Sequence, residues 1–266
     1  MTSLMHPPGH CCSTPVSDSV ALVFEHRTAE KHYEVRSAGR TVRLYTNRAF
    51  HSQWHPEHLF TGAVWDLLVL PVLYSSTAPR SVLLLGVGGG AVIHAINRLF
   101  PEIPIDGVEL DPIHLRIARQ FFNINYKNTR LIADDAVNYI ASSNAKVDVL
   151  IDDLFVDGSD DPKRPVNIHQ DWLSRLANRV SKHGVLIQNH LDTARARQTI
   201  RDNRPLLRRH FSEARLFTTD TFTNAILALY RQPVTRQRPD VIHDLQQDGH
   251  RAACRRLRFR SSRIPL

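Results

Sequence analysis

Cysteine is scarce in this chain, and its placement excludes two kinds of site. Three cysteines occur among 266 residues: Cys11 and Cys12 are adjacent near the N-terminus, and Cys254 lies close to the other end. This spacing provides neither a disulfide framework nor a set of zinc ligands. We therefore expect reduced thiols, a cytoplasmic protein and no metal site.

Long apolar runs and a secretory signal are also lacking. No stretch approaches the ~18 apolar residues that a membrane-spanning helix needs. Residues 1–20 are rich in proline, serine and histidine, and contain no basic segment followed by an apolar one. They are predicted to be a disordered leader before one main domain, with no insertion into a membrane.

Acidic charge is outnumbered by basic charge. The net charge is +8, and arginine is concentrated in residues 251–263. A basic tail can bind RNA or acidic lipid headgroups. The spacing of Ala253, Leu257 and Phe259 instead favours a terminal helix packed on the domain. Residues 236–266 are thus predicted to be a basic, helical tail, with nucleic acid as the less favoured partner.

The first third of the chain predicts a small sheet and a helix. Residues 21–50 contain short, partly alternating segments around a turn at residues 37–40, a pattern typical of an antiparallel sheet. Residues 56–76 have apolar residues at helical spacing, and Pro71 is expected to interrupt this helix.

From Ser81 onward the pattern changes to apolar runs that alternate with helical segments. The runs are residues 81–86, 103–109, 129–133, 147–152 and 184–189, and the helices are residues 91–100, 112–122, 135–142 and 169–182. This alternation is typical of a doubly wound parallel sheet that is buried on both faces.

The last two runs end the pattern differently. Residues 213–219 and 225–230 are separated by a short loop, which permits a hairpin but not a helical crossover. An antiparallel last strand is typical of class I S-adenosylmethionine-dependent methyltransferases. The predicted fold is therefore α/β: a doubly wound, mostly parallel, Rossmann-like sheet over residues 51–235, behind a β-rich extension over residues 21–50.

Candidate ligand residues follow the first two parallel strands. Gly86, Gly88 and Gly90 follow the first strand, where glycine lets the backbone approach a ligand at a helix N-terminus. Glu109 ends the second strand, and an acid about 20 residues beyond such glycines can accept hydrogen bonds from ribose hydroxyls. These features fit NAD and an adenosyl ligand equally.

The next two strands end in pairs of acids. Asp134 and Asp135 follow the third strand, where an acid would meet the adenine amino group in a methyltransferase-type site, and one of the two is expected to cap the next helix. Asp152 and Asp153 follow the fourth strand. They would overlook the sulfur-bearing end of the ligand, where an incoming amine is deprotonated or held.

A family resemblance rests on five segments in this order: residues 80–101, 105–112, 131–140, 147–158 and 183–189. Behind a β-rich extension they resemble the spermidine synthase (polyamine aminopropyltransferase) family and its spermidine-synthase-like relatives, over roughly residues 30–230. The resemblance implies transfer of a methyl or aminopropyl group, from S-adenosylmethionine or its decarboxylated form, to a small amine or another nucleophile. It also implies a homodimer.

The resemblance assigns roles by position. It implies a cofactor loop, a ribose acid, an adenine-side acid, a catalytic acid that takes the proton from the amine, and a glutamine near the cofactor. In this sequence these are Gly86, Gly88 and Gly90, then Glu109, Asp135, Asp153 and Gln53.

Three departures from the family pattern concern the acceptor. Polyamine-making members have an aspartate at the place of Gly89, a Tyr-His-Glu run at the place of residues 60–62, and a second acid at the place of Val156. A diamine needs fixed carboxylates, each contributing about 1.5–3 kcal/mol. The departures therefore argue against ordinary putrescine binding, and the loss of an acid at Gly89 favours the carboxylate-bearing methyl donor.

The histidines of residues 51–58 permit two interpretations. His51, His55 and His58 have the spacing of one helical face, but Pro56 interrupts the segment and no further ligands accompany them. A loop over the site is favoured over zinc, with Trp54 and Phe60 as lid or packing residues.

Three functions remain open at this point. The first is a spermidine-synthase-like transferase with Asp153 as base, and the second is an S-adenosyl-nucleotide-binding protein without catalysis. The third, an NAD-dependent oxidoreductase, is disfavoured because the acids after the third and fourth strands would have no role.

Overall fold

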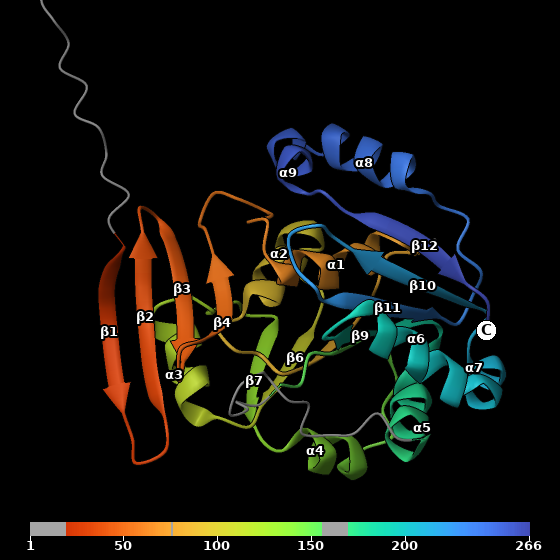
Figure 1. The fold of residues 1–266 in the computed structure, drawn as a ribbon, viewed down its shortest axis with the longest axis horizontal. Helices are drawn as coiled ribbons and strands as arrows, with labels where there is room; N and C mark the ends of the chain where they lie inside the picture. The colour runs from red at the N-terminus through yellow and green to blue at the C-terminus, as the bar shows by residue number, and fades with distance from the viewer. Residues whose placement is uncertain (1–19, 76, 156–169) are drawn as a thin grey trace, which may run out of the picture.

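A computed structural model describes residues 20–75, 77–155 and 170–266 (Figure 1). The chain begins with a four-stranded antiparallel sheet in the order β1-β2-β3-β4. Its strands are β1 (Ala21–Arg27), β2 (His32–Ala38), β3 (Thr41–Thr46) and β4 (Ala49–Trp54). Because β4 pairs with β3 as far as Trp54, residues 51–54 belong to this sheet and not to a loop over the site.

The main sheet has the order β12-β10-β11-β9-β8-β5-β6-β7 in the described residues. Strands β5 to β9 are parallel, and β11, β10 and β12 are antiparallel to their neighbours. The strands are β5 (Val82–Leu85), β6 (Ile105–Glu109), β7 (Thr129–Ala133), β8 (Val147–Asp152), β9 (Val180–His190), β10 (Glu213–Thr218), β11 (Ala225–Tyr230) and β12 (Arg260–Ile264). The predicted α/β fold with an antiparallel last hairpin is confirmed.

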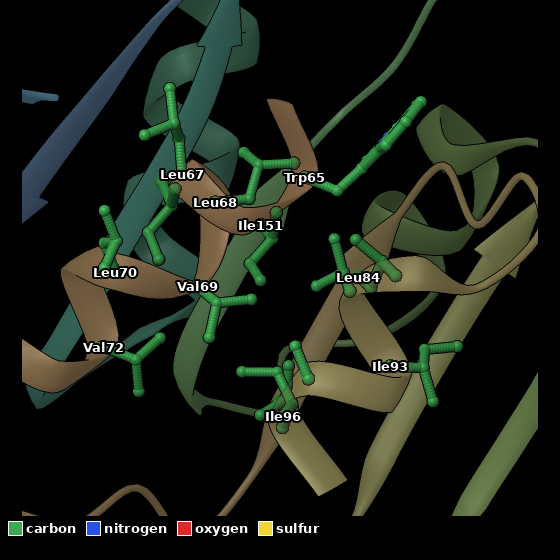
Figure 2. Packing of buried hydrophobic residues seen from close by; sticks show 14 of the residues in the cluster. Trp65, Leu67, Leu68, Val69, Leu70, Val72, Leu84, Ile93, Ile96 and Ile151 are labelled. Atoms are coloured by element: carbon green, nitrogen blue, oxygen red, sulfur yellow. The ribbon is translucent and has the colours of Figure 1, made fainter. Parts of the chain in front are cut away.

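Helices cover both faces of this sheet. They are α1 (Val64–Tyr74), α2 (Ala91–Leu99), α3 (Pro112–Gln120), α4 (Ala136–Ser142), α5 (Gln170–Arg179), α6 (Thr193–Asp202), α7 (Arg204–His210), α8 (Arg238–Gln247) and α9 (Arg251–Arg256). In β5, Val82 and Leu84 belong to the core layer of α1 to α3, whereas Leu83 and Leu85 belong to the layer of α4 to α7. Figure 2 shows the first layer, where α1, α2 and the strands meet.

Helix α1 differs from the prediction at both of its ends. It begins at Val64, because the Asp66 carboxylate accepts the N–H groups of Thr61 and Gly62 and folds the preceding chain under the first turn. It also continues past Pro71 to Tyr74. The helix is buried on nearly all sides, and this packing offsets the hydrogen bond that proline removes.

The basic tail is only partly helical, which corrects the prediction. Ala253, Leu257 and Phe259 are buried as their spacing indicated. The chain then forms β12, which pairs with β10 and extends the sheet. Cys254 is a free, half-buried thiol, whereas Cys11 and Cys12 lie outside the described residues. No helix in the described ranges has the length and apolar character needed to cross a membrane.

His94 joins α2 to the chain that follows α3. It is 4% exposed, its Nε2 lies 2.5 Å from the carbonyl oxygen of Phe122, and its Nδ1 lies 2.8 Å from the hydroxyl of Tyr126. The ring of Trp54 stacks on it at 4.4 Å between centroids. Burial lowers the pKa of His94 to about 4. His94 is therefore a neutral structural residue at pH 7.

This burial predicts a pH-dependent contribution to stability. Between pH 6.5 and 4, His94 binds a proton in the unfolded chain but not in the folded one. Its contribution to the free energy of unfolding therefore decreases as the pH is lowered, by up to about 3 kcal/mol. The stability advantage of wild type over His94→Gln, from urea denaturation, should shrink as the pH is lowered from 7.5 to 4.5. Other groups titrate equally in both proteins, so their effects cancel in this difference. One of them is Asp66, whose pKa burial raises to about 7. A constant difference would contradict the prediction.

Candidate functional site

A cavity of about 1080 Å³ lies at the carboxyl ends of β5, β6, β7 and β8. The first sheet contributes Lys31, Tyr33 and His51, and the side of β9 and β11 contributes Asn189 and Asn224. Doubly wound sheets bind ligands at this edge. The cavity is large enough for a nucleotide-sized molecule.

The loop between β5 and α2 approaches its neighbours too closely for side chains. Gly86 has a φ of +86°, and a Cβ there would lie 2.3 Å from the carbonyl oxygen of Asp153. A Cβ at Gly88, whose φ is +53°, would lie 2.9 Å from the carbonyl oxygen of His51. Both glycines line the cavity, so they present bare backbone to a ligand.

The next two glycines serve packing instead. A Cβ at Gly90 would lie 2.7 Å from the side chain of Ile124, and one at Gly89 would lie 2.7 Å from Phe122 and 2.8 Å from Ser52. Neither glycine is among the residues that line the cavity. The predicted ligand contact of Gly90 is therefore not supported, and an aspartate at position 89 would have to displace Phe122 or Ser52.

Glu109 connects the end of β6 to the glycine loop. Its Oε2 accepts the N–H groups of Val87 and Gly88 at 2.9 and 3.0 Å, and its Oε1 accepts the N–H of Asp111 at 3.0 Å. Burial acts to raise the pKa of Glu109, but His114 and these N–H donors outweigh it and hold the pKa below its usual value. The carboxylate is thus charged and lines the cavity.

A polar contact beside Glu109 attaches the first sheet to the main domain. Asp111 caps α3 by accepting the N–H of Ile113, and it also accepts hydrogen bonds from Lys31 at 2.8 Å and Tyr33 at 2.7 Å. Burial would raise the pKa of Asp111, yet its bonds to Lys31 and Tyr33 keep the pKa lowered. His114 forms a second contact, since its Nε2 lies 2.8 Å from the hydroxyl of Thr46.

Asp134 and Asp135 both line the cavity at the end of β7. The Asp135 carboxylate accepts the N–H of Val137 at 2.6 Å and caps α4. Asp134 accepts the N–H of Asp135 at 2.8 Å. One acid of the pair is therefore a helix cap, as expected, and both remain within reach of a ligand.

The two acids after β8 lie in different environments, which corrects one prediction. Asp152 is fully buried on the face of Leu150, and its Oδ2 accepts hydrogen bonds from Trp172 at 3.3 Å and Gln188 at 3.0 Å. It does not line the cavity, because strand alternation directs it beneath α5. Asp153 does line the cavity, and its Oδ1 accepts a hydrogen bond from Asn189 at 2.8 Å.

Gln53 is not a cavity residue either. Its Oε1 accepts from Arg43 at 2.8 Å, and its amide nitrogen donates to the carbonyl of Thr61. A register shift in the pairing of β3 with β4 falls at His51, which reaches the cavity in its place. The predicted cofactor contact of Gln53 is therefore not supported.

The remaining predictions for residues 51–62 separate into packing and lining. His55 and His58 stack at 3.6 Å between ring centroids, and the described ranges contain no group of three or more potential metal ligands. Phe60 is fully buried, so it is a packing residue and not a lid. In the segment after β4, Val64 and Trp65 line the cavity, whereas residues 60–62 do not. Val156 lies outside the described residues.

Five functional candidates were missed by reasoning from the sequence. Asn189 ends the fifth apolar run, and the rule applied to the other strand ends would have found it. Lys31, Tyr33, His114 and Asn224 carry no local signal, since the arrangement of the two sheets brings them to the cavity.

Comparison with solved structures identifies the fold of the protein. The probable spermidine synthase from Corynebacterium glutamicum ATCC 13032 matches with a TM-score of 0.69 at 14% identity, over 86% of this chain and 87% of that one. Human methyltransferase-like protein 13, solved in complex with SAH, matches with a TM-score of 0.57 at 21% identity, over 73% and 93%. The fold is that of spermidine synthases and class I methyltransferases.

The sequence comparison then defines the family. The model of the spermine/spermidine synthase domain matches residues 64–229, so the chain belongs to the spermine/spermidine synthase family. The polyamine aminopropyltransferase of Vibrio vulnificus (strain CMCP6) is 31% identical over 132 residues, which are 48% of this chain and 43% of that protein. The aligned part spans less than half of this relative and of other curated relatives. The resemblance inferred from the motifs is confirmed.

The close approach of the glycine loop gives a stability prediction. Gly86→Ala should lower the free energy of unfolding by more than about 3 kcal/mol. The new Cβ would clash with the carbonyl oxygen of Asp153, and alanine does not favour the positive φ of this position. Gly39→Ala is the matched control, since its φ is +57° with open space around it, and should cost about 1 kcal/mol. Equal losses in chemical denaturation would show that the loop can move away from Asp153.

Proposed function

We propose that the protein binds an S-adenosyl compound and transfers an alkyl group, methyl or aminopropyl, from it to a small amine, with Asp153 as the base. The observation that carries this proposal is that one cavity holds the Gly86 and Gly88 backbone, Glu109 and Asp153. The family supports it, since the matched relative is named a polyamine aminopropyltransferase and one structural neighbour was solved with SAH. A homodimer in the cytoplasm remains our expectation for the working form.

We propose that the parts of the ligand lie along the cavity in the order of the strands. Glu109 would hold the ribose, because each carboxylate oxygen has more than one lone pair with which to accept a hydrogen bond. Asp134 and Asp135, one strand further along, would meet the adenine. The glycine loop would lie under the amino-acid end, with Asp153 beyond it on the acceptor side.

The reaction needs little from the protein beyond alignment. The amine lone pair attacks the carbon attached to sulfonium, the C–S bond breaks, and the thioether leaves with the bonding electrons. The amine's extra proton passes to Asp153, whose carboxylate is held by Asn189. Positioning the two reactants and excluding water supplies the rate enhancement.

Adenosylmethionine is the donor that we propose. Position 89 is glycine, so the loop carries no carboxylate there that would repel the donor's own. The missing acceptor acids also allow the second candidate, a nucleotide-binding protein without catalysis. The NAD alternative is less well supported, because β10 and β11 form an antiparallel hairpin and the family model is not that of a dehydrogenase.

The donor can be identified by calorimetric titration. Adenosylmethionine, its decarboxylated form and methylthioadenosine should be titrated in parallel into the full chain. We expect adenosylmethionine to bind at least as tightly as the decarboxylated form. The Glu109→Gln variant should bind all three compounds measurably more weakly than wild type does. Binding of the decarboxylated form alone would overturn the assignment of the donor and point to aminopropyl transfer.

Replacing the base separates an enzyme from a binder. Asp153→Asn should reduce turnover with an amine acceptor by about 10²–10⁴-fold and leave donor affinity within a few fold, because the amide keeps the shape but cannot take a proton. Donor affinity is measured by calorimetry, and turnover by release of the thioether product. Wild-type protein that binds the donor but shows no turnover with a panel of amines would favour the non-catalytic reading.

A further inference from the structure

Two asparagines link three neighbouring strands beside Asp153. Asn189, at the end of β9, donates from Nδ2 to Oδ1 of Asp153 at 2.8 Å. Asn224, just before β11, donates from Nδ2 to Oδ1 of Asn189 at 3.0 Å. Asn189 is 3% exposed, and all three side chains line the cavity.

The register of the sheet brings these residues together. Asp152 of β8 lies opposite Gln188 of β9, so the next residues along the two chains, Asp153 and Asn189, lie side by side. Strand β11 runs antiparallel to β9, and its first residue, Ala225, lies opposite His190. The start of β11 therefore meets the end of β9, and an antiparallel last strand is what places Asn224 at the cavity.

The two hydrogen bonds fix which way the Asn189 amide points. An asparagine amide can be turned over, because its oxygen and nitrogen have nearly the same shape. Here the Asp153 carboxylate can only accept, so the NH₂ group of Asn189 faces it, and the donor from Asn224 to Oδ1 reinforces this orientation. The reversed amide would place an oxygen against the carboxylate and an NH₂ group against an NH₂ group, and both contacts are repulsive.

We propose that Asn189 and Asn224 are positioning residues for the proposed base, with Asn224 acting through Asn189. The proposal rests on the function proposed above, since it assigns the proton from the amine to Asp153. A donor held against Oδ1 stabilises the charged carboxylate and limits its rotation, so the carboxylate is ready to accept that proton. Asn224 keeps this donor in place.

Other charged or titratable side chains surround Asp153 and its cavity. Asp152 precedes it on β8, and His190 follows Asn189 on β9. The cavity is also lined by Glu30, Lys31, His51, Glu109, Asp111, His114, Asp134, Asp135, Asp192 and Arg195. The test therefore compares variants that leave this set unchanged. Removing either asparagine removes no charge, so a shift in the pKa of Asp153 reports the hydrogen bonds.

The test is a double-mutant cycle on the pKa of the Asp153 carboxyl group. The full chain is labelled with ¹³C at aspartate carboxyls, and the Asp153 signal is assigned by its loss in Asp153→Asn. We expect Asn189→Ala to raise the pKa by about one unit and Asn224→Ala to raise it by less. The double variant should match Asn189→Ala alone. Thr221→Ala, exposed in the same loop and outside the cavity lining, is the control and should leave the pKa unchanged.

Two results would overturn the proposal. One is an unchanged pKa in Asn189→Ala, and the other is an Asn224→Ala shift that persists in full when Asn189 is already alanine. If Asn189→Ala does not fold, Asn224→Ala and its effect on the acid limb of the pH–turnover profile still decide whether Asn224 acts on Asp153. The NMR titration needs no substrate, so a chain without transferase activity would disprove the proposed function while leaving this coupling measurable.

Discussion

The pairing of the Glu109 carboxylate with backbone N–H groups is the interaction on which the site depends. The glycine loop leaves β5 with φ values that only glycine tolerates well, and its N–H groups at Val87 and Gly88 have no partner within a helix or sheet ladder. Glu109 satisfies both of them from the neighbouring strand and accepts the N–H of Asp111 with its other oxygen. One charged side chain therefore fixes the loop, the end of β6 and the start of α3 relative to one another.

The first sheet is attached through the same region. Lys31 and Tyr33 donate to Asp111, which follows Glu109 by two residues, and the Thr46 hydroxyl contacts His114 in the first turn of α3. Buried polar contacts of this kind are costly unless every group has a partner, and here they are paired. The wall that the first sheet adds to the cavity is thereby positioned by Asp111 and His114, which follow Glu109 closely in the chain.

The sequence predicts most of the frame because buried parallel strands and their turns leave local signals. The alternation of apolar runs and helices, the glycines after β5 and the acids after β6, β7 and β8 were all visible in it. Side-chain direction was less visible: Asp152 and Asp153 are adjacent in sequence, yet only the structure shows Asp152 beneath Trp172 and Asp153 at the cavity. Gly90 and Gln53 match positions of the family pattern, but neither lines the cavity. Gly90 packs against Ile124, and the Gln53 side chain is hydrogen-bonded to Arg43. The prediction that Pro71 interrupts the helix was wrong, because the burial of α1 outweighs the loss of one backbone hydrogen bond.

The placement of the last described strand affects how this chain can fold during synthesis. Strand β12 pairs with β10, and Val241, Leu245, Leu257 and Phe259 join the core layer that contains α1. When the ribosome has made all the residues that line the cavity, it has still not made the C-terminal residues that pack on the α1 face of the sheet. Until they emerge, the apolar surface of α1 and the edge of β10 stay open to other chains in the cell. Residues distant from the cavity in sequence thus govern the interval in which the nascent protein is vulnerable to aggregation.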